Sequence, residues 1–203
     1  MSAESTVKQR LLELAIQTID ESGEPGIRVN QLAESAGVSI PTLYHHFGSR
    51  EGLIEEAQVE RFIRALRRDA EALVQQLGKC KTKADLLETL HQLFKNRKAK
   101  GRALTRWQRI NALGATYARP TLAERIVSSH DDVVTQIALA LLPFQRQGFI
   151  RQDIDLRAVI AWYNGALLGK NLVQISESAI DLAEWDRVFD EAVFAVLFGE
   201  LPT

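Results

Sequence analysis

The side chains between Gly37 and Leu53 include several types that can contact a polyanion. This run reads GVSIPTLYHHFGSREGL. Its threonine and tyrosine hydroxyls and its histidine ring N–H groups can donate hydrogen bonds to phosphates or base edges. Isoleucine and proline offer apolar contact to a thymine methyl group. The candidate residues for contact with DNA are Ile40, Pro41, Thr42, Tyr44, His45 and His46.

Two short helices joined by a tight turn are expected to position these side chains. The spacing of apolar residues predicts helices over about 30–36 and 40–47. Between them, Gly37 suits a backbone with positive φ and Ser39 can cap the second helix. The pattern predicts a helix-turn-helix, in which the second helix enters the DNA major groove. The residues expected to pack the two helices together are Leu32, Ala33, Val38, Leu43 and Phe47.

The rest of the chain also follows a helical pattern. Its 203 residues are enough for a sizeable core, and apolar residues recur at three- and four-residue steps. The sequence therefore predicts an all-α fold of about nine helices. Besides a first helix around residues 7–19, the longer ones are expected at about 50–77, 83–99, 102–115, 120–147, 155–177 and 182–198.

The charge of the chain is unevenly distributed although its net value is only −1. Residues 1–77 hold 8 lysines and arginines against 12 acidic residues, whereas residues 78–106 hold 9 against 2. Any DNA contact by the N-terminal part must therefore rest on a few well-placed groups. We interpret the basic stretch 79–102 as solvated helix-end charge, with contact to DNA flanks or to an anionic ligand such as an acyl-coenzyme A as open alternatives.

Several classes of protein are disfavoured by the sequence. The single cysteine, Cys80, excludes an internal disulfide, and no apolar run is long enough to span a membrane. The N-terminus does not resemble a signal peptide, so we expect a cytoplasmic protein. No His-Glu-x-x-His, Gly-x-Ser-x-Gly or P-loop pattern occurs, and we predict no enzyme, cofactor or metal. Neighbouring helical residues such as His45 and His46 point roughly 100° apart and cannot share an ion.

The run 37–53 resembles the signature of the tetracycline-repressor (TetR) family of bacterial transcription regulators. The shared pattern is Gly-Val-Ser, a small or polar pair, Thr-Leu-Tyr, one free residue, His-Phe, then Ser-basic-Glu-x-Leu. Residues 26–33 match the family's first motif helix, so the resemblance covers about residues 8–55. The family commonly has a capping threonine where this chain has Arg28, which can instead reach a phosphate as a cation.

The resemblance implies a DNA-binding domain over residues 1–50 and a helical ligand-binding and dimerisation domain over 51–203. It implies that the partners are a palindromic double-stranded DNA operator, a small-molecule effector and a second copy of the chain. We expect no membrane partner, because no apolar run is long enough to span a bilayer. By position, it assigns phosphate contacts to Ser39, Thr42, Tyr44, His46 and Arg50, and candidate base contacts to Asn30, Ile40, Pro41 and His45.

Two C-terminal helices give independent support for a dimer. Small residues at four-residue spacing on helix 155–177 favour close helix crossing, and helix 182–198 is apolar over too broad a surface for one covered face. We predict a four-helix interface between two chains. The alternative is that Gly165 and Gly169 of helix 155–177 pack against another helix of the same chain. The predicted interface residues are Ala161, Gly165, Gly169, Leu172, Val188, Phe189, Ala192 and Val196.

The expected effector is an apolar or aromatic small molecule that releases a repressor from its operator. Arg106, Arg109, His130 or Asn164 could hold a polar end of it. We expect the helix from Arg50 to be the only stiff connection between effector and DNA. The alternatives are a regulator that acts through a protein partner, a regulator without a ligand, and a helical enzyme. The predicted effector contacts are Trp107, Tyr117, Phe144, Trp162, Tyr163 and Asn164.

Overall fold

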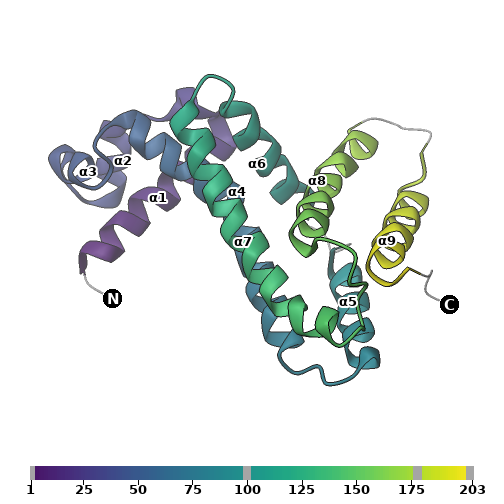
Figure 1. Cartoon of the computed structure of the whole chain (residues 1–203). Helices are drawn as coiled ribbons and strands as arrows, with labels where there is room; N and C mark the ends of the chain where they lie inside the picture. The colour runs from purple at the N-terminus through teal and green to yellow at the C-terminus, as the bar shows by residue number, and fades with distance from the viewer. Residues whose placement is uncertain (1–2, 98–101, 176–179, 200–203) are drawn as a thin grey trace. The chain divides into compact units, whose positions relative to one another are not determined.

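The computed structural model describes residues 3–97, 102–175 and 180–199, and within these residues every regular element is a helix. The predicted all-α fold is confirmed (Figure 1). The elements are α1 (Ala3–Ser22), the short 3-10 turn η1 (Glu24–Gly26), α2 (Val29–Ala36), α3 (Ile40–Phe47), α4 (Arg50–Leu77), α5 (Lys83–Arg97), α6 (Arg102–Ala115), α7 (Pro120–Arg146), α8 (Leu156–Gln174) and α9 (Leu182–Phe198).

The chain forms two compact units, and neither is a single continuous stretch. The first comprises residues 1–64 and 111–127, and the second comprises residues 65–110 and 128–203. Helices α4, α6 and α7 therefore each contribute residues to both units. The expectation that the helix from Arg50 is the only stiff connection is wrong. The motif on which that expectation rested ends before α6 and α7 begin, so it carried no information about them.

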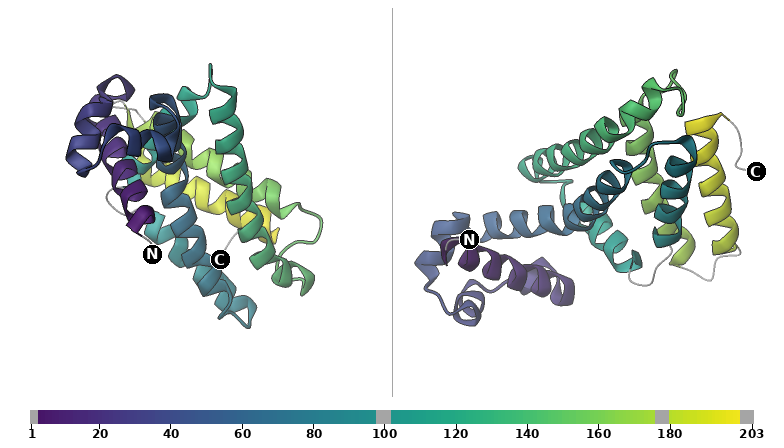
Figure 2. Two further views of the ribbon diagram at one scale, coloured as in Figure 1. Left: turned by 90° about the vertical axis from the view of Figure 1, so that its left-hand side faces the viewer. Right: turned by 90° about the horizontal axis from the view of Figure 1, so that it is seen from below.

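The first unit is built around the packing of α1, α2 and α3, which lie together in both views of Figure 2. Its core is aliphatic apart from Phe47, and Leu11 and Leu43 are fully buried there. Helix α3 has eight residues, too few to be stable in isolation. Its inward side chains Leu43 and Phe47 are buried in the core shared with α1, α2 and the start of α4. Tertiary packing therefore holds the outward face of α3 in place.

A buried arginine on α4 connects three segments of the first unit. Arg61 donates to Oδ1 of Asp20 on α1 from Nε (3.0 Å) and from a terminal nitrogen (2.7 Å). It also donates to Oε1 of Gln58 (2.6 Å) and to Oδ1 of Asn111 on α6 (2.8 Å). Gln58 in turn donates to Glu24 of η1 (2.7 Å). The three-helix packing is therefore tied by polar contacts to α4 and to the C-terminal end of α6.

In the second unit, α8 packs beside α9 (Figure 1). A buried ion pair joins the two helices, because Nζ of Lys170 lies 2.7 Å from both carboxylate oxygens of Asp186. Phe189 of α9 is also buried, and its ring stacks on those of Trp162 (6.1 Å between centroids) and Trp185 (5.1 Å). These contacts fix which face of each helix points away from the unit.

The described helices set limits on two further kinds of site. None of them is both long enough and apolar enough to cross a membrane. Over the same residues, no group of three or more His, Cys, Asp or Glu side chains is arranged to hold a metal ion.

Candidate nucleic-acid interface and cavity

The turn between α2 and α3 has the backbone geometry that its sequence predicts. Gly37 adopts the left-handed conformation (φ 68°, ψ 35°), which confirms the expected positive φ. The N–H of Gly37 donates to the carbonyl of Glu34, and that of Val38 donates to Ala33, which closes α2. Ser39 then caps α3, since its hydroxyl accepts a hydrogen bond from the N–H of Thr42 (3.3 Å). The angle between the two helices is thus set by local hydrogen bonds.

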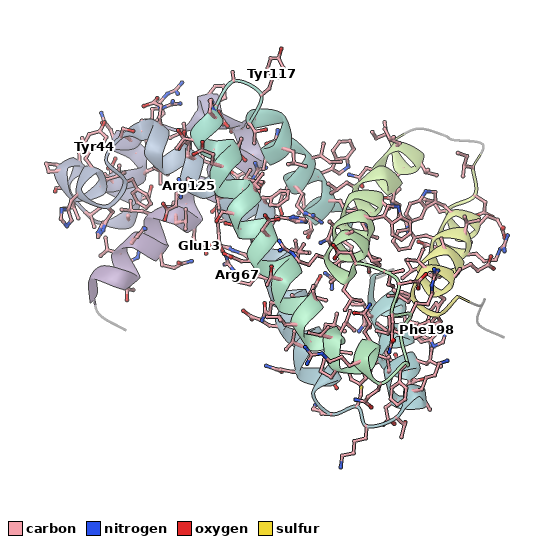
Figure 3. All side chains as sticks on the ribbon, viewed as in Figure 1. Glu13, Tyr44, Arg67, Tyr117, Arg125 and Phe198 are labelled. Atoms are coloured by element: carbon pink, nitrogen blue, oxygen red, sulfur yellow. The ribbon has the colours of Figure 1, made fainter. Side chains whose placement is uncertain are left out.

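The outward face of α3 carries the side chains expected to meet DNA. Tyr44 is 41% exposed and Ile40 is 36% exposed, and Figure 3 labels Tyr44 on this helix. Pro41 and His45 are exposed as well, whereas Thr42 and His46 are half-buried. The rings of His45 and His46 meet edge to face with their centroids 5.5 Å apart. The structure therefore brings all six candidate residues onto one short helix, with hydroxyl and ring N–H groups at its surface.

The remaining predicted DNA contacts lie at the edges of this helix pair. Asn30, at the start of α2, is exposed, and so is Ser39, whose hydroxyl lies 2.8 Å from that of Thr42. Arg28 precedes α2 without capping it through its side chain, which instead donates to the carbonyl of Pro25. Arg50 donates to the carbonyls of Glu24 (2.9 Å) and Ile27 (3.2 Å). The role of these side chains on DNA remains a prediction.

One structural residue in the signature was missed by the sequence reasoning, which treated position 52 as free. A Cβ added to Gly52 would lie 2.1 Å from the carbonyl oxygen of Phe47, closer than atoms can approach. The hydroxyl of Ser49 accepts a hydrogen bond from the N–H of the same glycine (2.9 Å) and so caps the start of α4. Gly52 therefore lets α4 begin directly against the end of α3. Sequence spacing gives no signal for this, because only the close backbone approach creates the need for glycine.

The second unit contains a cavity of about 370 Å³. This volume lies within the range of small-molecule sites. Its walls come from α4, α5, α6, α7, α8 and α9 and are mostly apolar. The apolar lining residues with large side chains are Leu66, Leu73, Leu90, Leu93, Phe94, Ile137, Leu141, Val159, Ile160, Tyr163, Leu167, Val193 and Leu197.

Only part of the predicted effector site lies at this cavity. Tyr163 and Asn164 line it, and so do Arg106 and Arg109, which were expected to hold a polar end. Phe144 is buried outside the lining, and Trp107 and Trp162 are each more than two-fifths exposed. Tyr117 is 98% exposed and points away from the turn between α6 and α7 in the first unit (Figure 3).

One face of α6 brings three guanidinium groups to the cavity. Arg102, Arg106 and Arg109 are spaced four and three residues apart, so they share a helical face, and all three line the cavity. Arg102 forms an ion pair with Asp69 of α4. Arg106 donates from Nε to Oδ1 of Asn171 (2.8 Å) and from a terminal nitrogen to Gln174. Arg102 was missed as a cavity residue, because it was read as part of a solvated basic stretch.

The deepest of these groups is strongly affected by burial. Arg109 is 5% exposed, and burial lowers the pKa of its guanidinium to about 10, with the charge of Asp69 acting in the opposite direction. Burial also lowers the pKa of His130, and the charge of Arg109 lowers it further. A ring nitrogen of His130 lies 3.4 Å from the side-chain amide nitrogen of Asn164. At neutral pH the imidazole is uncharged while Arg109 keeps its charge.

The residues predicted for a dimer interface divide into exposed and buried ones. Leu172 is 75% exposed and Val188 is 57% exposed. A Cβ added to Gly165 or Gly169 would meet none of the described atoms within 4 Å, so the alternative that these glycines pack against another helix of this chain is wrong for the part that the structure describes. Ala161 is exposed, Ala192 and Val196 are half-buried, and Phe189 is buried inside the unit.

Comparison with known proteins identifies the segment that carries the helix pair. Residues 11–57 match the model of the tetR family of bacterial regulatory proteins. A transcriptional regulator from Brucella canis, BetI, is 36% identical over 69 residues, which is 34% of each chain. A regulatory protein from Mycobacterium tuberculosis, RaaS, is 44% identical over 52 residues, 26% of this chain and 24% of that protein. The matched segment therefore spans about a third or less of these curated relatives.

The fold as a whole has counterparts among solved structures. A Mesorhizobium loti protein assigned to the tetR family of transcriptional regulators superposes with a TM-score of 0.72, over 97% of this chain and 99% of that one. Its sequence identity is 16%, so the likeness concerns the arrangement of helices and not the contents of the cavity.

Proposed function

Because the chain belongs to the tetR family of bacterial regulatory proteins, we propose that it is a DNA-binding transcription regulator whose recognition helix is α3. The observation that carries this proposal is the outward face of α3, where Tyr44 and His45 are exposed next to the left-handed turn at Gly37. Such a face offers hydroxyl and ring N–H donors to the major groove. The named relatives are transcription regulators and not enzymes, and a DNA-binding protein would act in the bacterial cytoplasm.

We further propose that two copies of the chain bind one palindromic operator. One eight-residue recognition helix makes too few contacts for specific affinity, whereas a two-fold dimer presents two helices to half-sites ~34–36 Å apart or at a related spacing. The exposed apolar residues Leu172 and Val188 support α8 and α9 as the joining surface. A single species of monomer mass in sedimentation at micromolar concentration would refute the dimer.

The cavity in the second unit supports a ligand-responsive regulator. We propose that the protein is a repressor while it is bound to its operator. A small molecule that binds in the cavity then releases the protein from that operator. Linkage demands that the ligand weaken DNA binding by the same factor as DNA weakens ligand binding. An operator affinity that stays constant while the ligand saturates its site would contradict this part of the proposal.

The experiment that tests DNA readout is selection of binding sites from a random duplex pool. The full chain is compared with a Tyr44→Ala/His45→Ala double variant, and with a Gln17→Ala/Glu21→Ala variant whose exposed pair on α1 lies away from α3 in the sequence. We expect a palindromic consensus for the full chain and the α1 variant, and its loss in the α3 variant. Equal enrichment by all three proteins would show that α3 does not read the DNA.

A further inference from the structure

The cavity of the second unit combines apolar walls with an excess of positive charge. Among the described residues that line it, the charged side chains are the three arginines of α6 and the carboxylate of Asp69. Asp69 is paired with Arg102 and also acts on Arg109, so one carboxylate serves two guanidiniums. The described lining therefore carries a net formal charge of +2, from three cations and one anion. A buried positive charge of this size favours an anionic guest over a neutral one.

The buried hydrogen-bond donors among the described lining residues come from α6 and α8, whereas the buried lining residues of α4 and α5 are apolar. Arg106 and Arg109 are only 7% and 5% exposed, and both come from one face of α6. Asn164 of α8, itself 3% exposed, adds a side-chain amide to the cavity wall, and Thr105 of α6 adds a hydroxyl. The leucines and Phe94 of α4 and α5 contribute the apolar remainder. A ligand that complements both the polar and the apolar parts of the lining has an anionic head group and a hydrocarbon body.

From these observations we infer that the effector is an amphipathic organic acid, whose carboxylate binds at Arg106 and Arg109 and whose hydrocarbon part fills the apolar remainder of the cavity. The planar guanidinium group matches a carboxylate through two parallel hydrogen bonds, so it holds this head group better than a neutral hydroxyl. The acid is ionised at neutral pH, because the unperturbed pKa of a carboxyl group is about 4. The inference rests on the proposed effector role of this cavity and adds the chemical class of its ligand.

Two other titratable side chains of the described part of the unit do not change this count. Asp186 lies on α9 in an ion pair with Lys170 and is not part of the cavity lining. His130 is next to Asn164 and is uncharged at neutral pH, so it neither cancels nor supplies the positive charge. A carboxylate bound near Arg106 and Arg109 would add one negative charge to a described lining that holds three positive charges and one negative charge.

The test measures binding directly by calorimetry on the full chain without DNA. The probes are hexanoate, octanoate, decanoate and dodecanoate, each compared with the primary alcohol and the primary amine of the same length. A hydrogen bond to a charged group is stronger than one between neutral groups, so we expect at least one acid to bind ~10-fold more tightly than its alcohol, and the amine to bind more weakly still. If no acid of any length exceeds its alcohol by this factor, the inference is wrong.

Variants locate the effect within the cavity. We expect Arg106→Met and Arg109→Met each to weaken binding of the preferred acid ~10-fold while binding of the matched alcohol changes less than about twofold. Arg68→Met is the matched control, because Arg68 is exposed on α4 and does not line the cavity, and it should bind the acid like the parent chain. Equal loss of acid and alcohol binding in a folded Arg109→Met protein would mean that the arginine only shapes the cavity, and would overturn the inference. If neither cavity variant folds, the comparison of acids with alcohols on the parent chain decides alone.

This experiment separates the failure of the inference from the failure of the proposed function. A protein that binds acids selectively but keeps its operator when the acid saturates it would retain the inferred ligand class and lose the proposed release mechanism. A protein that releases its operator for some neutral compound and shows no preference for acids would keep the proposed function and refute the inference.

Discussion

Replacement of Arg61 by methionine should destabilise the first unit more than any other single change to its polar contacts that we consider. Arg61 is 7% exposed and donates to Asp20, Gln58 and Asn111. Removing one partner of a buried ion pair costs about 3–5 kcal/mol, because the other charge stays behind in poor solvent. The side chain of Asp20 keeps 26% of its surface exposed, so water recovers part of this loss. We therefore expect Arg61→Met to lower the free energy of unfolding by about 3 kcal/mol.

Urea unfolding followed by far-ultraviolet circular dichroism measures this change. With a slope of roughly 2–3 kcal/mol per molar urea, the midpoint should fall by about 1 M. The matched control is Arg64→Met on the same helix. Arg64 also pairs with α1, through Glu13 at 2.7 Å, but its side chain is 36% exposed. Exposed pairs contribute about 0–1 kcal/mol, so the midpoint of this variant should move by less than about 0.4 M.

A double variant tests the reasoning behind the magnitude. If the cost arises because the charge of Asp20 loses its hydrogen bonds to Arg61, then Arg61→Met/Asp20→Asn should recover about 1–2 kcal/mol of the loss. A double variant as unstable as Arg61→Met would show that the hydrogen bonds to Gln58 and Asn111, and not the buried charge, carry the effect. Equal destabilisation by Arg61→Met and Arg64→Met would refute the argument from burial altogether.

Three further outcomes are expected. Gly37→Ala should cost about 1–2 kcal/mol because its φ is +68° although the added methyl meets no atom, whereas Gly114→Ala, with equal space inside α6, should gain about 0.5–1 kcal/mol in the same melts. The lowered pKa of His130 means that the unfolded chain binds more protons between that pKa and 6.5, so stability should increase as the pH is raised through this window and decrease as it is lowered, and His130→Gln should flatten that slope in urea melts. A dimer that contacts phosphate through Arg28 and Arg50 of each protomer should lose operator affinity with a log–log salt slope of roughly −3.6 in fluorescence anisotropy, and a slope steeper than about −8 would show that other cations take part.

The sequence was sufficient for the local architecture around α3. Signals that act over a few residues lie at its borders, namely the glycine of the turn, the Ser39 cap and the Pro41 at the helix start. They give the observed bounds of Ile40–Phe47. The same kind of signal gives Arg50–Leu77 for α4, because Ser49 precedes it as a cap. Such features are readable because their physical cause is contained in the segment itself.

The residues that line the cavity could be only partly predicted from the sequence, because the lining depends on which faces of the long helices pack toward one another. Aromatic residues were favoured as its lining since they combine apolar surface with polar tips, yet Trp107 and Trp162 are exposed and Tyr163 alone of the predicted aromatic contacts lines it. The partners of Arg61 lie 41 and 50 residues away in the sequence, and no periodicity encodes such a pairing. Helical period indicates that a face is apolar but does not say which other helix covers it.

The contrast between the two units explains why charge counts over the whole chain are uninformative here. In the first unit, arginines form ion pairs with carboxylates, such as Arg119 with Glu24 at 2.5 Å and Arg61 with Asp20 at 2.7 Å. The buried guanidinium of Arg61 stabilises this unit because the carboxylate of Asp20 lies beside it. In the cavity, Arg102, Arg106 and Arg109 share a single carboxylate within the described lining. The same residue type therefore stabilises the fold in the ion pair of Arg61 with Asp20 and lines an apolar cavity at Arg106 and Arg109, and a chain with a net charge of −1 can hold both arrangements.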